Sequence, residues 1–137
     1  MAENVQSVMT ANPRTVAPDA SIEEACRVMR DEDTGIVPIA EGDRLVGTIT
    51  DRDVAIRVVA EGRSLDTRVD EVASRELVTI DPQQELDEAT RLMAKHQVRR
   101  LPVVEEDGRL VGIVSQADVA RHASDERTGD LVEDISR

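Results

Sequence analysis

Aromatic side chains are absent from this chain of 137 residues, which contains no phenylalanine, tryptophan or tyrosine. The hydrophobic core must therefore be built from valine, isoleucine, leucine, methionine and alanine. A site that binds a flat ring cannot stack it on an aromatic side chain, so aliphatic groups and backbone must hold it. The sequence thus excludes recognition by aromatic stacking.

Cysteine is represented once, by Cys26, so the chain cannot form an internal disulfide. This agrees with a reducing compartment. Cys26 lies on the apolar stripe of an expected helix, and no histidine or other base is near it in the sequence. We therefore interpret it as a small buried apolar residue rather than a catalytic thiolate.

Positive charge is also scarce, with 17 basic against 29 acidic residues and a formal net charge of -12. A nucleic acid or an anionic membrane would require a basic face, so neither is expected as a partner. No apolar run approaches the roughly 20 residues that span a bilayer. The first residues, MAENVQSVMT, do not resemble a signal peptide. The expected location is the cytoplasm; whether the acidity reflects a salt-rich cytoplasm or a GC-rich genome stays open.

An internal repeat organises the chain. Ala25 and Ala89 are 64 positions apart, as are Pro38 and Pro102, and one added residue in the following turn makes the later offset 65. The segment TVAPDASIEEACRVM aligns with TIDPQQELDEATRLM, and IVPIAEGDRLVGTIT aligns with RLPVVEEDGRLVGIVS. The halves are residues 1–66 and 67–137. Because one unit of about 60 residues buries little apolar surface, we expect the two to share a core, sheet against sheet.

Each copy predicts strand, helix, strand, strand and helix. An extended run ends at a proline, an apolar stripe of helical period follows, two short strands are joined by an acidic glycine-containing turn, and a second helix closes the unit. Ser21 with Glu24 forms a predicted capping box, and Glu85 gives the second copy a weaker cap. A short helix is expected before each unit, at NVQSVMT and RVDEVAS. The predicted class is α+β with an α/β-like order of elements.

These paired motifs, together with HQVRRLPVV and LVGIVSQADVARH, resemble a tandem pair of CBS domains, or Bateman module. The resemblance runs from about Val5 to His122. The arrangement of the chain is similar to that of the stand-alone hypoxic response proteins of actinobacteria. It implies a regulatory module that senses AMP, ADP, ATP or S-adenosylmethionine in clefts between the two repeats. It also implies a homodimer, in which two chains form a flat disc of four repeats.

Two aspartates follow hydroxyl residues at strand-to-helix turns, and these pairs are the first site candidates: Thr50 with Asp53, and Ser115 with Asp118. The spacing is that of a helix cap, which requires no ligand. The same geometry could accept a ribose diol at the carboxylate and donate to a phosphate from the hydroxyl and helix N–H groups. The resemblance implies ribose and phosphate contact, and both roles can coexist.

Further candidates follow from the resemblance or from charge. The apolar walls and base-reading backbone of an adenine pocket are predicted at Thr15, Ile36, Val37, Pro38, Thr79, Arg100, Leu101 and Pro102. Phosphate-binding cations are predicted at Arg52, Arg99 and Arg121, although an ion pair on the surface is the ordinary role of such an arginine. Gly47 and Gly112 are expected to allow close packing, and His96 to complement the end of a helix.

The copies differ at the candidate sites, because TDRD carries two carboxylates and SQAD carries one. Extra carboxylate repels an anion, so the Ser115–Asp118 site is expected to suit a charged nucleotide better. No metal-ligand cluster or nucleophile motif is evident, so we predict neither catalysis nor a required cofactor or metal. The alternatives are a CBS-pair interaction protein with vestigial sites, an enzyme, and a regulator of an unidentified protein partner. For the acidic tail at 124–137, the sequence does not decide between disorder and an added helix.

Overall fold

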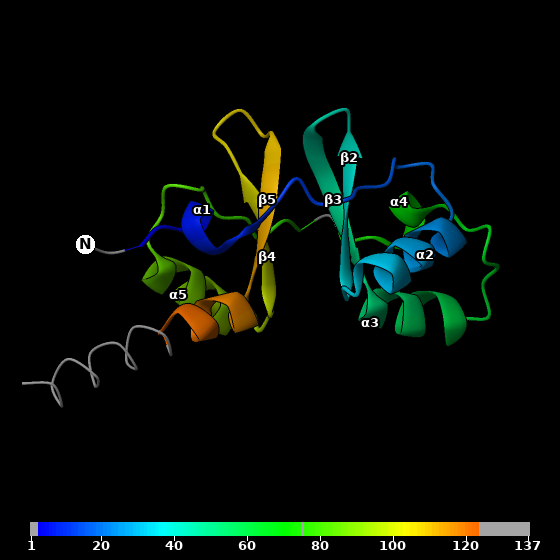
Figure 1. Ribbon diagram of the computed structural model, residues 1–137. Helices are drawn as coiled ribbons and strands as arrows, with labels where there is room; N and C mark the ends of the chain where they lie inside the picture. Colours follow the sequence, from blue (N-terminus) through cyan, green and yellow to red (C-terminus); the bar gives the residue numbers. More distant parts are fainter. Residues whose placement is uncertain (1–2, 75, 124–137) are drawn as a thin grey trace, which may run out of the picture.

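The computed structural model describes residues 3–74 and 76–123, so the tail expectation lies outside the described residues. Helices and strands are both distributed along the whole described chain (Figure 1). The elements are α1 (Val5–Val8), β1 (Thr10–Ala11), α2 (Ile22–Glu32), β2 (Ile36–Glu41), β3 (Arg44–Thr50), α3 (Asp51–Asp53), η1 (Val54–Val59), α4 (Val69–Val72), α5 (Leu86–His96), β4 (Arg100–Val104) and β5 (Leu110–Ser115). Residues 116–123 are also helical.

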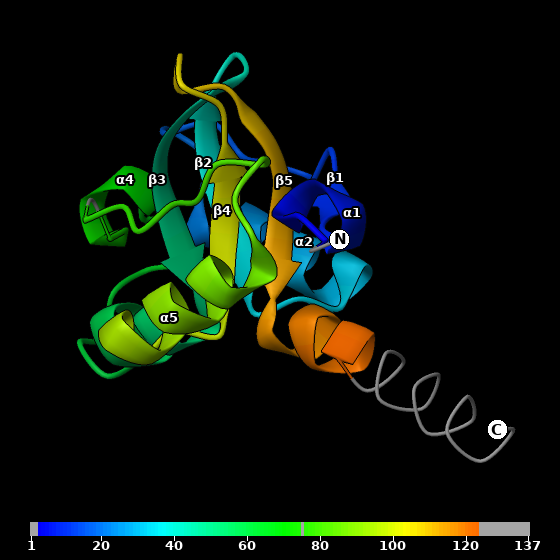
Figure 2. The same cartoon turned by 90° about the vertical axis from the view of Figure 1, so that its left-hand side faces the viewer.

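Two small sheets stand side by side at the centre of the molecule, with helices outside them (Figure 1). One sheet pairs β2 with β3, and the other has the strand order β1-β5-β4. Helices α2, α3 and α4 lie beside the first sheet, and α1 and α5 lie beside the second (Figure 1). In the turned view of Figure 2 the second sheet lies in front of the first. This confirms the predicted α+β class, with two repeats packed sheet to sheet.

The two hairpins repeat each other in register. In the first, Ile36 pairs with Thr50 and the register shifts after Ile39. In the second, Arg100 pairs with Ser115 and the register shifts after Val103. Each hairpin therefore places the start of its first strand directly against the hydroxyl residue that ends its second strand.

The first predicted strand of each copy is reduced to a single bridge. Val16 bridges Ile39 in parallel, and Ile80 bridges Val103 in the same way. The Val16 N–H donates to the Pro38 carbonyl at 3.1 Å, and the same bond joins Ile80 to Pro102. The Ala40 and Val104 N–H groups donate in return to the Val16 and Ile80 carbonyls, at 3.0 and 2.9 Å. The ladder does not extend further, because Pro38 and Pro102 have no N–H and another proline closes each run.

The first helix of each copy forms where predicted. The Ser21 hydroxyl accepts from the Glu24 N–H at 3.1 Å, whereas Glu85 gives α5 no side-chain cap, as expected. Only the serine half of the first predicted box is present. Both helices end at a residue in the left-handed region, Asp33 at φ 50° and Gln97 at φ 54°.

The second helix of the first copy departs from the predicted α-helix. After α3, residues Val54–Val59 form a π-helix, and the Ala60 N–H donates to the Ala55 carbonyl at 2.9 Å. The wider i to i+5 bond turns Val58 into the core, where it is buried, and leaves Ile56 and Val59 exposed. Hydrophobic period alone did not distinguish this from an α-helix.

Two separate core clusters replace the single shared core that we expected. Val69 and Val72 of α4 pack with residues of the first repeat, and Val5 of α1 packs with residues of the second. Each short helix thus completes the core of the other half. Strand β1, from the first half of the sequence, likewise joins the sheet of the second repeat, where Thr10 pairs with Ile113 of β5.

Within residues 3–74 and 76–123, no helix has the length and apolar character required to cross a membrane.

Candidate functional site

Two clefts lie between the repeats. The Asp53 cleft has a volume of about 760 Å³ and is lined by Gly35, Ile36, Thr48, Thr50, Asp51, Arg52, Asp53, Ser74, Glu76, Val78, Gln97, Val98, Arg99, Arg100 and Pro102. The Asp118 cleft has a volume of about 230 Å³ and is lined by Thr10, Pro13, Arg14, Val28, Glu32, Asp33, Thr34, Ile36, Pro38, Arg100, Ile113, Ser115 and Asp118.

The sequence repeat relates the clefts to each other. Positions 64 or 65 apart occupy matching places in them, as with Thr10 and Ser74, Pro38 and Pro102, or Thr50 and Ser115. Each cleft combines the hydroxyl–aspartate turn of one repeat with the first hairpin strand of the other. Ile36 and Arg100, which begin the two strands, border both clefts.

The hydroxyl–aspartate turns are complete capping boxes in both repeats. The Thr50 hydroxyl accepts from the Asp53 N–H at 3.1 Å, and Asp53 Oδ2 accepts from the Thr50 N–H at 3.0 Å. Ser115 and Asp118 make the same pair of bonds at 3.0 and 3.1 Å. The caps hold both carboxylates at their clefts, and each hydroxyl keeps its own proton available for donation.

Strand alternation decides which predicted pocket residues reach a cleft. Ile36, Pro38, Arg100 and Pro102 line the clefts. Val37 and Leu101 have no exposed surface and belong to the two cores, so the prediction that they form pocket walls is corrected. Successive side chains of a strand point to opposite faces, and only one face of each strand meets the other repeat.

The predicted closing residues Thr15 and Thr79 are one position away from the residues that line the clefts. Arg14 takes this place in the Asp118 cleft and Val78 in the Asp53 cleft. Thr15 is exposed and Thr79 is half-buried, and neither lines a cleft. The prediction found the right segments but the wrong register, because these runs form bridges rather than full strands.

Three arginines gather at one cleft, and two of them, Arg52 and Arg99, are predicted phosphate cations. Arg52 and Arg99, with Arg100, line the Asp53 cleft. Arg121 lines neither, and its Nη2 donates to Asp118 Oδ1 at 3.2 Å. A phosphate contact of Arg121 stays a prediction, and its observed ion pair is with Asp118, which lines the Asp118 cleft.

The cleft linings do not favour the expected order of the two sites, because each cleft has three carboxylates while the Asp53 cleft has three arginines and the Asp118 cleft two. The Asp118 cleft has the carboxylates Glu32 and Asp33 from the end of α2, which the comparison of TDRD with SQAD did not include. The Asp53 cleft receives arginines from the second repeat. Local motifs missed this because each cleft is built across the repeats. The repeat offset of 64 was the available signal for these missed lining residues. It relates Arg14 and Thr34 of the Asp118 cleft to Val78 and Val98 of the Asp53 cleft.

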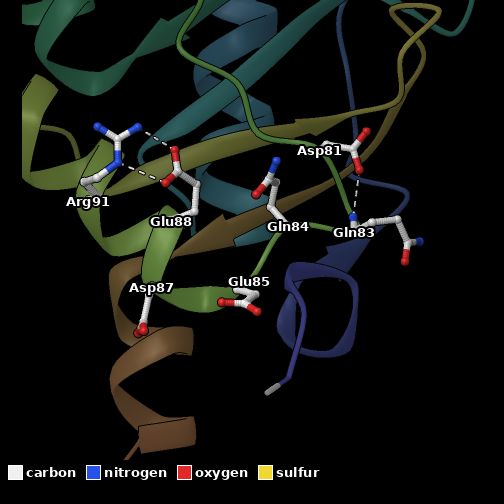
Figure 3. Close-up of a pocket in the computed structure, with 7 residues that line it drawn as sticks. All are labelled: Asp81, Gln83, Gln84, Glu85, Asp87, Glu88 and Arg91. Atoms are coloured by element: carbon white, nitrogen blue, oxygen red, sulfur yellow. Dashed lines mark hydrogen bonds and ion pairs between the residues drawn. The ribbon is translucent and has the colours of Figure 1, made fainter. Parts of the chain in front are cut away.

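A third hollow, shown in Figure 3, lies at the start of α5 and contains none of the predicted site residues. Its volume is about 470 Å³, and it is lined by Asp81, Gln83, Gln84, Glu85, Asp87, Glu88 and Arg91. In the first repeat the matching helix start is covered, because the Ile22 and Glu23 N–H groups donate to the Thr67 and Leu65 carbonyls. The hollow is lined by one repeat only, so we do not treat it as the candidate site.

Other sequence candidates lie away from the clefts. Cys26 packs against the first core, and burial raises the pKa of its thiol above the ordinary value. This supports its interpretation as an apolar residue. His96 lies in the last turn of α5. Among residues 3–74 and 76–123, no three His, Cys, Asp or Glu side chains are grouped so that they could hold a metal ion.

Comparisons with known proteins agree with this architecture. The CBS domain family model matches residues 5–60 and again residues 69–125. The chain is 42% identical over 134 residues to CBS domain-containing protein YhcV of Bacillus subtilis (strain 168), covering 97% of this chain and 95% of that protein.

Three solved structures are similar over most of their length. Hypoxic Response Protein I with two coordinated zinc ions has a TM-score of 0.80 and 38% identity, covering 88% of this chain and 98% of that one. CBSX2 in complex with AMP has a TM-score of 0.79 and 25% identity, covering 90% and 98%. The CBS domain pair of protein MJ0100, in complex with 5′-methylthioadenosine and S-adenosyl-L-methionine, has a TM-score of 0.83 and 26% identity, covering 92% and 99%. With its two matched repeats and the clefts between them, the chain belongs to the CBS domain family as a tandem pair.

Proposed function

We propose that this protein is a regulatory module that binds an adenosyl ligand, either an adenine nucleotide or S-adenosylmethionine, and does not catalyse a reaction. One observation carries the proposal: two symmetry-related clefts each join the capped aspartate of one repeat to the first hairpin strand of the other. The solved CBS pairs with AMP or S-adenosylmethionine support the ligand class. Binding would bridge the two repeats and favour the arrangement that the ligand prefers.

The capping boxes supply the chemistry for this binding. Asp53 uses Oδ2 for the Thr50 N–H, and its Oδ1, which is 3.8 Å from Arg57, can accept from a ribose hydroxyl. The Thr50 hydroxyl accepts from the chain and can donate its proton to a phosphate oxygen. The apolar surfaces of Ile36 and Pro102 would contact the base, in place of the aromatic rings that the chain lacks.

Thermal melting with and without millimolar AMP, ATP or S-adenosylmethionine tests the proposal. A ligand at 100 times its dissociation constant should stabilise the folded state by about 2.7 kcal/mol. Native mass spectrometry of the purified protein should detect a retained adenosyl compound. An unchanged melting temperature with every ligand would instead favour the interaction protein with vestigial sites, and hydrolysis of nucleotide would favour an enzyme.

We propose further that two chains associate through helical surfaces in the cytoplasm, with an unidentified protein as a further partner. Ile56 and Val59 support an interface, because these apolar side chains of η1 are 46% and 68% exposed. Light scattering should give twice the chain mass for the native protein, and the variant Val59→Asp should shift it towards the monomer. A monomeric native protein would contradict the dimer without affecting the ligand proposal.

A further inference from the structure

The described arginines of this chain fall into two groups, those that form an ion pair with a carboxylate and those that do not. Within residues 3–74 and 76–123, nine arginines lie within 4.0 Å of a carboxylate: Arg14, Arg27, Arg30, Arg57, Arg63, Arg68, Arg91, Arg109 and Arg121. In the same part of the chain, the arginines without such a pair are Arg44, Arg52, Arg99 and Arg100. Of these four, all except Arg44 line the Asp53 cleft.

This distribution is unusual for so acidic a chain. With 29 acidic and 17 basic residues, a guanidinium on the surface has many carboxylates to pair with. Arg52 and Arg99 are exposed and Arg100 is half-buried, so all three can reach a ligand. Guanidinium groups that converge without internal partners match the several oxygens of a phosphate chain, which they bind bidentately.

The carboxylates of the Asp53 cleft are partly occupied by the chain itself. Asp53 Oδ2 accepts from the Thr50 N–H, and Asp51 Oδ1 accepts from the Arg52 N–H at 2.8 Å. Glu76 is exposed at the rim. The three carboxylates balance the three arginines in formal charge, and within the described residues Asp51 and Glu76, like the three guanidinium groups, have no ion pair.

The Asp118 cleft has the same number of carboxylates but two arginines instead of three, Arg14 and Arg100. Arg14 lies 3.6 Å from Asp31, whose pKa is held below its ordinary value by the hydrogen bond from Arg30 and by the charges of Arg30 and Arg14. Arg100 is shared with the larger cleft. Glu32 and Asp33 add carboxylates at the rim, and the volume of about 230 Å³ is less than a third of that of the Asp53 cleft.

We propose that the two clefts take different adenosyl ligands. The Asp53 cleft binds adenosine with two or three phosphates, and the Asp118 cleft binds an adenosyl compound without a phosphate chain, whose substituent is uncharged or cationic. This inference rests on the proposed adenosyl-binding function and assigns a ligand class to each cleft. Arg100 lines both clefts. A polyphosphate bound in the Asp53 cleft would therefore contact a guanidinium group that also borders the Asp118 cleft.

Isothermal titration calorimetry of the full chain with ATP and with S-adenosylmethionine tests this assignment. The double variant Arg52→Gln/Arg99→Gln should weaken ATP binding by at least about tenfold, since each lost charge-assisted hydrogen bond costs about that factor. S-adenosylmethionine should bind this variant within about twofold of the native protein, a difference below about 0.4 kcal/mol. Arg44→Gln is the matched control, because Arg44 has no ion pair among the described residues and lines neither cleft, and it should leave both affinities unchanged.

The reciprocal variant Glu32→Gln/Asp33→Asn should weaken S-adenosylmethionine binding and spare ATP. Asparagine tolerates the left-handed conformation of residue 33, so the end of α2 is preserved. Circular dichroism melts of all variants check that the fold is intact. Equal loss of ATP and S-adenosylmethionine in either double variant would overturn the assignment of the clefts while leaving adenosyl binding established. A native protein that binds neither ligand would overturn the proposed function as well.

Discussion

At the scale of single residues, the two strand glycines have different roles. A Cβ added at Gly112 would lie 2.9 Å from the Thr10 carbonyl oxygen and would also collide with the Met9 side chain. A Cβ at Gly47 would meet nothing closer than the Ser74 carbonyl at 3.4 Å, which is an ordinary contact. The close approach of the N-terminal segment to β5 therefore requires glycine at position 112 only.

The variant Gly112→Ala should be destabilised by about 1–3 kcal/mol, because the backbone of Thr10 must move to admit the methyl group. Gly47→Ala is the control and should change the free energy of unfolding by no more than about 1 kcal/mol in either direction. Urea denaturation measures both. Equal destabilisation of the two variants would mean that strand conformation, not the contact with Thr10, decides the cost.

At the scale of elements, the two first helices differ at their caps while sharing the same backbone. Ser21 has φ -80° and ψ 158° and caps α2 with its hydroxyl. Glu85 has φ -73° and ψ 155° at the start of α5 and makes no side-chain cap. The backbone at the start of α5 therefore has the conformation that a hydroxyl cap requires, but the residue there is a glutamate.

The variant Glu85→Ser should raise the free energy of unfolding by about 0.5 kcal/mol, because the new hydroxyl can accept from the Glu88 N–H as Ser21 does from Glu24. The matched change Ser21→Ala should lower it by about 1 kcal/mol. Chemical denaturation of both variants without ligand provides the measurement. Destabilisation by Glu85→Ser would mean that the acidic side chain stabilises the helix more than a hydroxyl cap would.

At the scale of the whole molecule, the halves of the sequence are not the units of packing. The core of the first repeat includes Val69 and Val72 from beyond the predicted boundary at 66, and the core of the second includes Val5 from before it. Each half therefore depends on a short helix of the other to bury its apolar surface.

Fragments 1–66 and 67–137, expressed separately, should each fail to fold, and mixing them should restore the native circular dichroism spectrum and a cooperative melt. The reason is that a unit of about 60 residues is already marginal and here lacks part of its core. A cooperative thermal transition in either fragment alone, near that of the intact chain, would contradict this dependence.

Local chemistry and the internal repeat determined much of this protein from sequence alone. The repeat could be predicted by comparing the chain with itself. The hairpins, the first helices and the capping residues Thr50, Asp53, Ser115 and Asp118 could be predicted because they depend on neighbours within a few positions. Conversion of part of a helix to η1 could not be predicted, because the hydrophobic period does not distinguish a π-helix from an α-helix.

Only the tertiary structure decided which residues form the candidate site. Strand alternation directed Val37 and Leu101 into the cores and Pro38 and Pro102 towards the clefts, and the register of the bridges selected Arg14 over Thr15. The crossing of the repeats then brought Arg99 and Arg100 to Asp53 and left Glu32 and Asp33 beside Asp118. Closeness in the sequence does not predict these contacts. The charge of a cleft is the sum of the charged side chains from several segments, and only the packing of the chain brings those segments together.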